Sequence, residues 1–191
     1  LVVGGGSSAW AEEVTYDFTE IDGFATWTNS YLSHTVTYSD AIVTFASASH
    51  QASTITNQPV TKGGAVTLVL TDGSTMSSAT FVCTQWTTKP QTITLHYSTD
   101  GGETYTSTGI TSTNFTITEN NLPAGTNAVK ITFSSTSNQV GIASATIVKV
   151  GTTPSTNPSI TADNVEIAYD ATLGAIEYSI NNPVDGGTLT T

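Results

Sequence analysis

The sequence predicts an all-β protein, with a jelly-roll-like β-sandwich followed by the first strands of a second β domain. From Val14 onward, apolar and polar residues alternate with a period of two, which is typical of strands that bury one face. Turn residues separate these segments. Threonine, which is β-branched and fits a pleated surface, supplies about a fifth of the chain.

The strands are expected wherever the alternation is continuous. The segments, in chain order, are 14–19, 34–38, 41–45, 66–70, 79–86, 92–97, 114–118, 128–133 and 142–150. Glycine, proline and aspartate lie between them, as in Lys62-Gly63-Gly64 and Asp100-Gly101-Gly102. About eight to ten short strands in one domain fit a jelly roll better than a seven-stranded immunoglobulin-type sandwich.

The segment 92–107, "TITLHYSTDGGETYTS", gathers polar and aromatic residues and could be either an active site or a hairpin. Alternation places Tyr97 on the inward face and His96 on the outward face. The two glycines after Asp100 supply positive-φ positions for a tight turn, and Asp100 is expected to cap it. Glu103 and Tyr105 would then begin the return strand. A hairpin accounts for every residue of this segment.

The chain is expected to have four parts. These are a signal-peptide remnant or flexible leader at 1–11, the sandwich at 12–150, a linker at 151–159 and a truncated second domain at 160–191. "LVVGGGSSAWA" ends in an Ala-x-Ala pattern, which favours export. The second domain has an expected hairpin at 171–174, and its few strands predict that the sequence is a fragment of a longer protein.

Charge excludes several classes of partner. Only 10% of residues are charged, the net charge is −11, and the basic residues are four lysines. Nucleic acid and anionic membranes are therefore not expected partners, and no stretch has the length needed for membrane insertion. The single cysteine, Cys83, is expected to be a small buried apolar group rather than a reactive thiol.

No catalytic residue is predicted. The histidines His34, His50 and His96 are far apart in the sequence, and no metalloprotease, nucleophile-elbow or phosphate-loop motif is present. The sequence predicts no cofactor other than calcium. A calcium site at Asp17, Glu20 and Asp22 is one interpretation, and a solvated acidic edge is the other.

Aromatic residues give the candidate ligand-binding site. Trp27 and Trp86 could stack on sugar rings, with Tyr31 nearby and with Asn29 and Gln85 as hydrogen-bonding partners. The alternative is that both tryptophans close the ends of the sandwich core.

Three segments resemble a jelly-roll module of exported surface proteins from gut Bacteroidetes. They are "YDFTEIDGFATWTNSYLSHTVTYSDAIVTF", "TFVCTQWTTKPQTITLHYSTDGGETYTSTG" and "LPAGTNAVKITFSSTSNQVGIASATI". The tail "NPSITADNVEIAYDATLGAIEYSINNPVDGGTLT" resembles the start of an immunoglobulin-like domain of BACON type, a class often associated with carbohydrate binding. The resemblance implies export to the cell surface and a multidomain architecture.

These observations predict a non-catalytic recognition module of an exported, multidomain cell-surface protein, with carbohydrate as the expected ligand. The alternative is a structural or adhesion spacer that mediates protein–protein contacts. A hydrolase would instead need two carboxylates that converge in a cleft.

Overall fold

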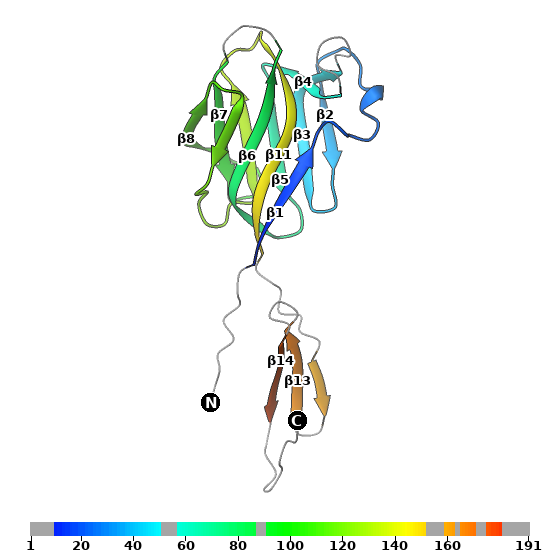
Figure 1. Ribbon diagram of the computed structural model, residues 1–191, viewed down its shortest axis with the longest axis vertical. Helices are drawn as coiled ribbons and strands as arrows, with labels where there is room; N and C mark the ends of the chain where they lie inside the picture. The colour runs from blue at the N-terminus through cyan, green and yellow to red at the C-terminus, as the bar shows by residue number, and fades with distance from the viewer. Residues whose placement is uncertain are drawn as a thin grey trace. The chain divides into compact units, whose positions relative to one another are not determined.

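The structure, a computed structural model, describes residues 10–50, 57–86, 91–151, 159–162, 165–170 and 175–180 (Figure 1). Contacts divide the chain into two compact units, one of which is Ala11–Gly151, while the other contains the C-terminal strands. Strands dominate both units, as expected. The helical element among the described residues is a single 3-10 turn, η1 (Phe24–Thr26), so no described helix could span a membrane.

Eleven strands are described in the first unit. They are β1 (Trp10–Asp17), β2 (Leu32–Thr37), β3 (Ala41–His50), β4 (Pro59–Lys62), β5 (Ala65–Leu70), β6 (Thr75–Gln85), β7 (Ile93–Ser98), β8 (Thr106–Ser112), β9 (Thr116–Glu119), β10 (Ala128–Phe133) and β11 (Gln139–Gly151).

The strands form two layers. One layer has the order β2-β3-β5-β10-β7-β8 and the other has the order β1-β11-β6-β9. β4 pairs with the last residues of β3 on one side and with the first residues of β11 on the other, so hydrogen bonds join the two layers at this point. From β5 to β7 the chain moves to the other layer and back, as in jelly rolls (Figure 1). The predicted β-sandwich is confirmed.

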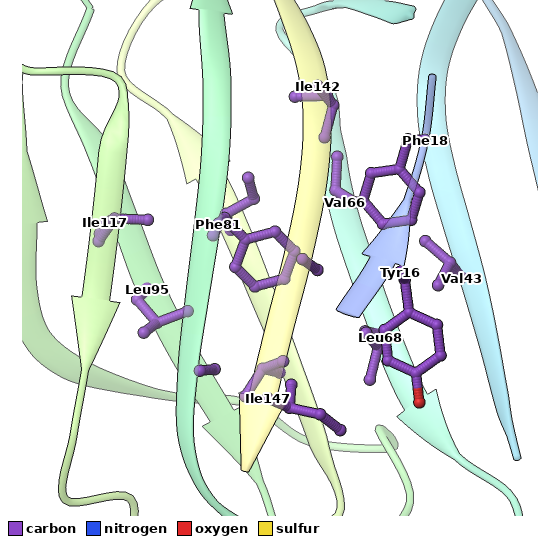
Figure 2. Close-up of a cluster of buried hydrophobic side chains, with 14 of the residues drawn as sticks. Tyr16, Phe18, Val43, Val66, Leu68, Phe81, Leu95, Ile117, Ile142 and Ile147 are labelled. Atoms are coloured by element: carbon purple, nitrogen blue, oxygen red, sulfur yellow. The ribbon is translucent and has the colours of Figure 1, made fainter. Parts of the chain in front are cut away.

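The core lies between the layers and is built from the inward residues of each strand (Figure 2). In β5, Val66 and Leu68 are fully buried, whereas Ala65 and Thr67 between them are only partly covered. Phe81 of β6 faces them from the second layer. Burying such apolar side chains is the main stabilising contribution to a sandwich.

β11 does not keep one simple alternation. Its pairing with β6 shifts between Ile142 and Ser144, where a bulge inserts one extra residue. Before the bulge, Val140 and Ile142 face inward, and after it Ala145 and Ile147 do. The bulge therefore keeps apolar residues in the core although the sequence pattern changes phase.

Pairs of threonine hydroxyls lie on the outer surface of both layers. On the second layer, Thr15 Oγ1 lies 2.9 Å from Thr146 Oγ1, and Thr80 Oγ1 lies 3.0 Å from Thr118 Oγ1. Because Thr146 and Thr80 are paired across β11 and β6, these four residues form one row across four strands. We call this the threonine row. It explains how the chain keeps its outer surface polar with so few charges.

The segment 92–107 forms the hairpin of β7 and β8, as expected. Asp100 caps the connecting loop by accepting hydrogen bonds from the Thr104 amide and hydroxyl. The loop is longer than a tight turn, because the return strand begins at Thr106. The prediction that Glu103 and Tyr105 begin it is therefore wrong.

His96 lies on the outward face of β7, as predicted. It is half-buried rather than fully exposed, and its Nε2 lies 3.0 Å from Thr132 Oγ1. Burial, together with the nearby charge of Lys130, lowers the pKa of the imidazole. Its neighbours across the strand are a hydroxyl and an ammonium group rather than a catalytic carboxylate.

The sequence patterns missed β4, and they placed the start of the return strand, β8, too early. β4 has four residues and begins with a proline, and β8, "TSTGITS", is a polar edge strand with little apolar alternation. At the amino end, β1 begins at Trp10, so Trp10 and Ala11 of the expected leader lie in a strand, while residues 1–9 lie outside the described residues.

The second unit contains an antiparallel sheet of β12 (Ser159–Ala162), β13 (Val165–Asp170) and β14 (Ala175–Ile180). Asp170 pairs with Ala175, so the strands on both sides of the expected hairpin at 171–174 are paired, although the turn lies outside the described residues. Most of the expected linker, 152–158, also lies outside them. The boundaries of the leader, the linker and the second domain stay predictions.

Candidate functional site

A pocket of about 330 Å³ lies at the edge of the sandwich, between the loop that follows β1 and strand β2. Two segments that are close in space but separated in sequence form its walls. The lining residues are Glu20, Ile21, Asp22, Trp27, Thr35, Val36, Thr37 and Tyr38. Carboxylates, hydroxyls and two aromatic rings therefore share one concave surface.

Trp27 is held by aromatic contacts on several sides. The turn η1, entered through Gly23 at φ +72°, places Trp27 directly after Thr26. The indole is stacked on the His34 imidazole, with centroids 3.9 Å apart and 7° between the planes. It also makes edge contacts with Phe24 and Phe45, at 5.1 and 5.8 Å. The part of the indole that these rings leave uncovered borders the pocket, so this surface is fixed before any ligand binds.

The polar part of the lining is acidic. Glu20 and Asp22 are exposed, and both border the pocket. Asp17 accepts hydrogen bonds from the amide and the hydroxyl of Thr19, at 2.8 and 2.7 Å, and these bonds lower its pKa. Ionised carboxylates accept hydrogen bonds and donate none, so this side of the pocket is suited to ligands rich in donors.

Tyr38 also lines the pocket. Its ring packs edge-on against Tyr16 at 4.9 Å, and Tyr16 donates a hydrogen bond to Asp40. Burial, assisted by the charge of Asp17, raises the pKa of Tyr38 to about 12, so the hydroxyl is neutral at physiological pH. Among the described residues its Oη has no hydrogen-bond partner, although the atom is buried.

Of the five predicted ligand-binding residues, only Trp27 lines this pocket. Tyr31 contacts a second group of residues, since Gln139 Nε2 donates to its hydroxyl and Lys62 Nζ lies 5.7 Å from its ring centroid. Gln85 is exposed at the end of β6, and the half-buried Trp86 follows it.

The remaining predicted residue, Asn29, is exposed in the loop that leads to Tyr31. The pocket and the Tyr31 group are thus described as separate surfaces. The assignment of Tyr31, Asn29, Gln85 and Trp86 to a ligand stays a prediction.

The acidic segment 17–22 has two interpretations from the sequence, a calcium site and a solvated acidic edge. Glu20 and Asp22 border the same pocket, but the Asp17 carboxylate is occupied by Thr19. Within the ranges that the structure describes, no group of three or more His, Cys, Asp or Glu side chains is arranged to hold a metal ion. The calcium site therefore gains no support from the geometry and stays a prediction.

Two sequence interpretations of single residues have clear outcomes. Cys83 is 7% exposed and is part of the core, as predicted, and burial raises the pKa of its thiol to about 12. The histidines are less scattered than the sequence indicated. His50 packs edge-on against Phe24 at 4.7 Å, while His34 stacks on Trp27, so both contact the aromatic cluster around η1.

Sequence reasoning missed most of the lining, including Thr35, Thr37 and Tyr38. Thr35 and Thr37 belong to β2, and Tyr38 follows it. Their alternation indicates a strand, but it does not show which segment of the chain packs beside that strand. The one available signal was Trp27, flanked by small polar residues.

No known family model matches the chain, and no curated protein is similar to it in sequence. Solved structures with a similar fold include three mutants of CBM29-2, a family 29 carbohydrate binding module. The first is 11% identical, with a TM-score of 0.38, over 73% of this chain and 86% of that chain.

The other two CBM29-2 mutants are complexes, one with cellulohexaose and one with mannohexaose. The cellulohexaose complex is 13% identical over 72% of this chain and 91% of that chain, with a TM-score of 0.38. The mannohexaose complex is 12% identical over 73% and 92%, with a TM-score of 0.35. Similarity at this level does not identify a binding surface that this chain shares with these modules.

Proposed function

We propose that the chain is a non-catalytic carbohydrate-binding module and that its site is the pocket bordered by Trp27, Glu20 and Asp22. The observation that carries this proposal is the combination of a fixed indole surface with two carboxylates and two threonine hydroxyls around one pocket.

This combination matches the chemistry of a sugar. A pyranose ring has an apolar face of C–H groups, which packs on an aromatic surface, and a rim of hydroxyls that donate and accept hydrogen bonds. Glu20 and Asp22 are acceptors for such donors, and Thr35 and Thr37 can serve either role. The volume of about 330 Å³ lies at the lower end of the range for small-molecule sites. The pocket is therefore suited to one or two sugar rings, such as the end of a chain.

Thr37 gives a specific polar contact. Its side chain is exposed and lines the pocket, so its hydroxyl is accessible to a ligand. Tyr38 contributes its ring to the lining, because its Oη atom is buried.

The test is a glycan array followed by isothermal titration calorimetry with wild type, Trp27→Phe and Thr37→Val. The first variant keeps an aromatic ring and the second keeps the shape of the side chain, so both should fold, which thermal unfolding verifies. Each should weaken glycan binding roughly tenfold or more, the scale of a central contact in a binding site. Trp86→Phe is the matched control, because Trp86 does not line the pocket, and it should bind as wild type does.

Two outcomes would contradict the proposal. The first is an array on which folded wild-type protein binds no glycan. The second is a glycan whose affinity is unchanged in both pocket variants and reduced in Trp86→Phe, which would move the site to the Tyr31 side.

A hydrolase is the second candidate, because two carboxylates border the pocket. Both side chains are exposed, whereas a general acid in a glycosidase works in a site that limits water. Incubation with any bound glycan tests this directly, and release of new reducing ends that is abolished by Glu20→Gln would favour hydrolysis over binding.

An adhesion spacer is the third candidate. It would use exposed apolar side chains, and the large ones among the described residues are Leu32, Val82 and Ile110, at 52%, 37% and 38% exposure. These lie on β2, β6 and β8. Because they are on three different strands, they give weaker support to a docking face than the pocket gives to a glycan site.

The wider setting is also part of the proposal. We infer an exported, cell-surface protein in which this module precedes an immunoglobulin-like domain of BACON type, on the basis of the amino-terminal Ala-x-Ala pattern and the resemblance of the tail. Fractionation of cells that express the natural full-length protein, with detection of the module at the surface by antibody, tests this setting.

A further inference from the structure

The charged groups around the pocket all have the same sign. Glu20 and Asp22 border it. The charge of Asp17 helps to raise the pKa of Tyr38, which also lines the pocket. A ligand that enters the pocket therefore meets up to three negative charges.

No described lysine balances these charges at the pocket. Lys62 lies over Tyr31 and Lys130 lies over the Tyr105 ring at 4.1 Å, while Lys89 lies outside the described residues. Lys149 is connected to Tyr38 through Asp40 and Tyr16, but it contacts two aspartates, Asp40 and Asp72, which together outweigh its charge. The field at the pocket is thus negative, and the net charge of −11 adds to it at low ionic strength.

The lining also lacks cationic donors. The groups that border the pocket are carboxylates, hydroxyls, an indole and apolar side chains. Sites that recognise carboxylates or sulfates use arginine, lysine or clustered backbone N–H groups instead. A glycan with uronic acid or sulfate groups would bring a charge of the wrong sign close to Glu20 and Asp22.

We propose that the pocket selects an amino sugar, in which a protonated amine lies between Glu20 and Asp22 while the sugar ring packs against Trp27. This inference rests on the proposed carbohydrate-binding function and names the chemical class that the site prefers. The ammonium group donates up to three hydrogen bonds, which two carboxylates and the nearby threonine hydroxyls can accept.

The size of the preference follows from the exposure of the carboxylates. Ion pairs at exposed sites each contribute little, so two of them should favour the amine over the same sugar without charge by roughly fivefold. The preference should decrease between about 0.01 M and 1 M salt, where the screening length falls from about 30 to 3 Å. The contribution of the aromatic contact with Trp27 to the binding affinity should change much less with salt.

The experiment uses matched sugars that share one ring and differ at a single substituent, which is cationic, neutral or anionic. Glucosamine, galactosamine and mannosamine, each free, N-acetylated and as the parent neutral hexose, are presented as polyvalent conjugates together with the corresponding uronic acids. Wild type is compared with Glu20→Gln/Asp22→Asn, which keeps the shape of both side chains. The matched control is Glu12→Gln/Glu13→Gln, which removes two exposed carboxylates of β1 that do not line the pocket.

The expected result is binding of at least one free amino sugar roughly fivefold more tightly than its acetylated and neutral forms, with the uronic acid weakest. The pocket variant should lose this preference, and the control should keep it. Equal binding of charged and neutral forms, with affinity still dependent on Trp27, would overturn the charge selectivity and leave carbohydrate binding intact. Failure of every one of these sugars to bind folded protein would overturn the amino-sugar inference, and an empty glycan array as well would overturn carbohydrate binding.

Discussion

Nζ of Lys149 lies 2.7 Å from Oδ2 of Asp72, and the Lys149 side chain is only 6% exposed. Asp40 lies 2.8 Å from the same nitrogen and accepts a further hydrogen bond from Tyr16. Lys149 is on β11, while Asp40 and Asp72 lie in the connections before β3 and after β5. The cluster therefore links the two layers of the sandwich at one end.

Replacement of Lys149 should be strongly destabilising. In Lys149→Met, Asp40 and Asp72 would face each other without a cation, and because both carboxylates are partly exposed, the loss should cost about 2 kcal/mol. Urea denaturation at neutral pH measures the change in the free energy of unfolding. Lys130→Met is the matched control, because Lys130 makes only a cation–π contact with Tyr105, and it should cost about 1 kcal/mol or less. Similar losses in both variants would contradict a special role for the cluster.

Acid should weaken the fold partly through Asp72. Burial of this carboxylate opposes its ionisation, but hydrogen bonds from Lys149 and Ser74 outweigh burial and lower its pKa from 3.8 to about 2. A carboxylate whose pKa is lower in the folded state stabilises fully above the unfolded value, so its contribution should be lost as the pH falls from about 4 to 2.

The variant Asp72→Asn tests this by removing one titrating group. The free energy of unfolding should depend less steeply on pH between about 4 and 2 in the variant than in wild type. Some dependence should remain, because hydrogen bonds also lower the pKa values of Asp17 and Asp100. An unchanged slope would show that Asp72 titrates alike in the folded and unfolded chains.

Gly64 should not tolerate a side chain. A Cβ at this position would lie 1.7 Å from the carbonyl oxygen of Ala46 and 2.8 Å from Oγ1 of Thr61, so the backbone of β3 would have to move. Gly64→Ala should destabilise by several kcal/mol or prevent folding. Gly73→Ala is the control, since nothing lies within 4 Å of its Cβ position and only its φ of +80° is strained. Its thermal midpoint should fall much less.

Cys83 should react only when the fold opens. Its thiol is buried and its pKa is raised to about 12, so almost no thiolate is present at pH 8. Labelling with a disulfide reagent should be slow in buffer and fast in urea, with a rate that follows the population of unfolded protein. Rapid labelling of native protein would show that the core opens locally near β6.

The fold was largely predictable because its signal is local. Alternation of apolar and polar residues located most strands, and it placed His96 outward on β7. β8 was expected only as the return strand of the hairpin after Asp100, because both of its faces are mostly exposed and its own sequence has little apolar alternation. The phase change at Ser144 could not be anticipated, since a bulge depends on the partner strand β6.

The site was less predictable because its walls come from separate segments. Trp27 was identified from its neighbours in the chain, but its orientation depends on His34 and Phe45, which lie on β2 and β3. Tyr31 was grouped with Trp27 by sequence proximity, yet its hydroxyl contacts Gln139 more than a hundred residues away. Residues as close in the sequence as Trp27 and Tyr31 can therefore contact different parts of the fold, so proximity in the sequence did not predict a shared site.

The threonine row has a consequence for the behaviour of the molecule in solution. Threonine hydroxyls do not titrate in the normal pH range and carry no charge. The part of the outer surface formed by the threonine row should therefore stay hydrated at high salt and at low pH. Repulsion between molecules comes from the carboxylates and disappears as these are protonated. When the carboxylates lose their charge in acid, the threonine row therefore still presents hydroxyls to water.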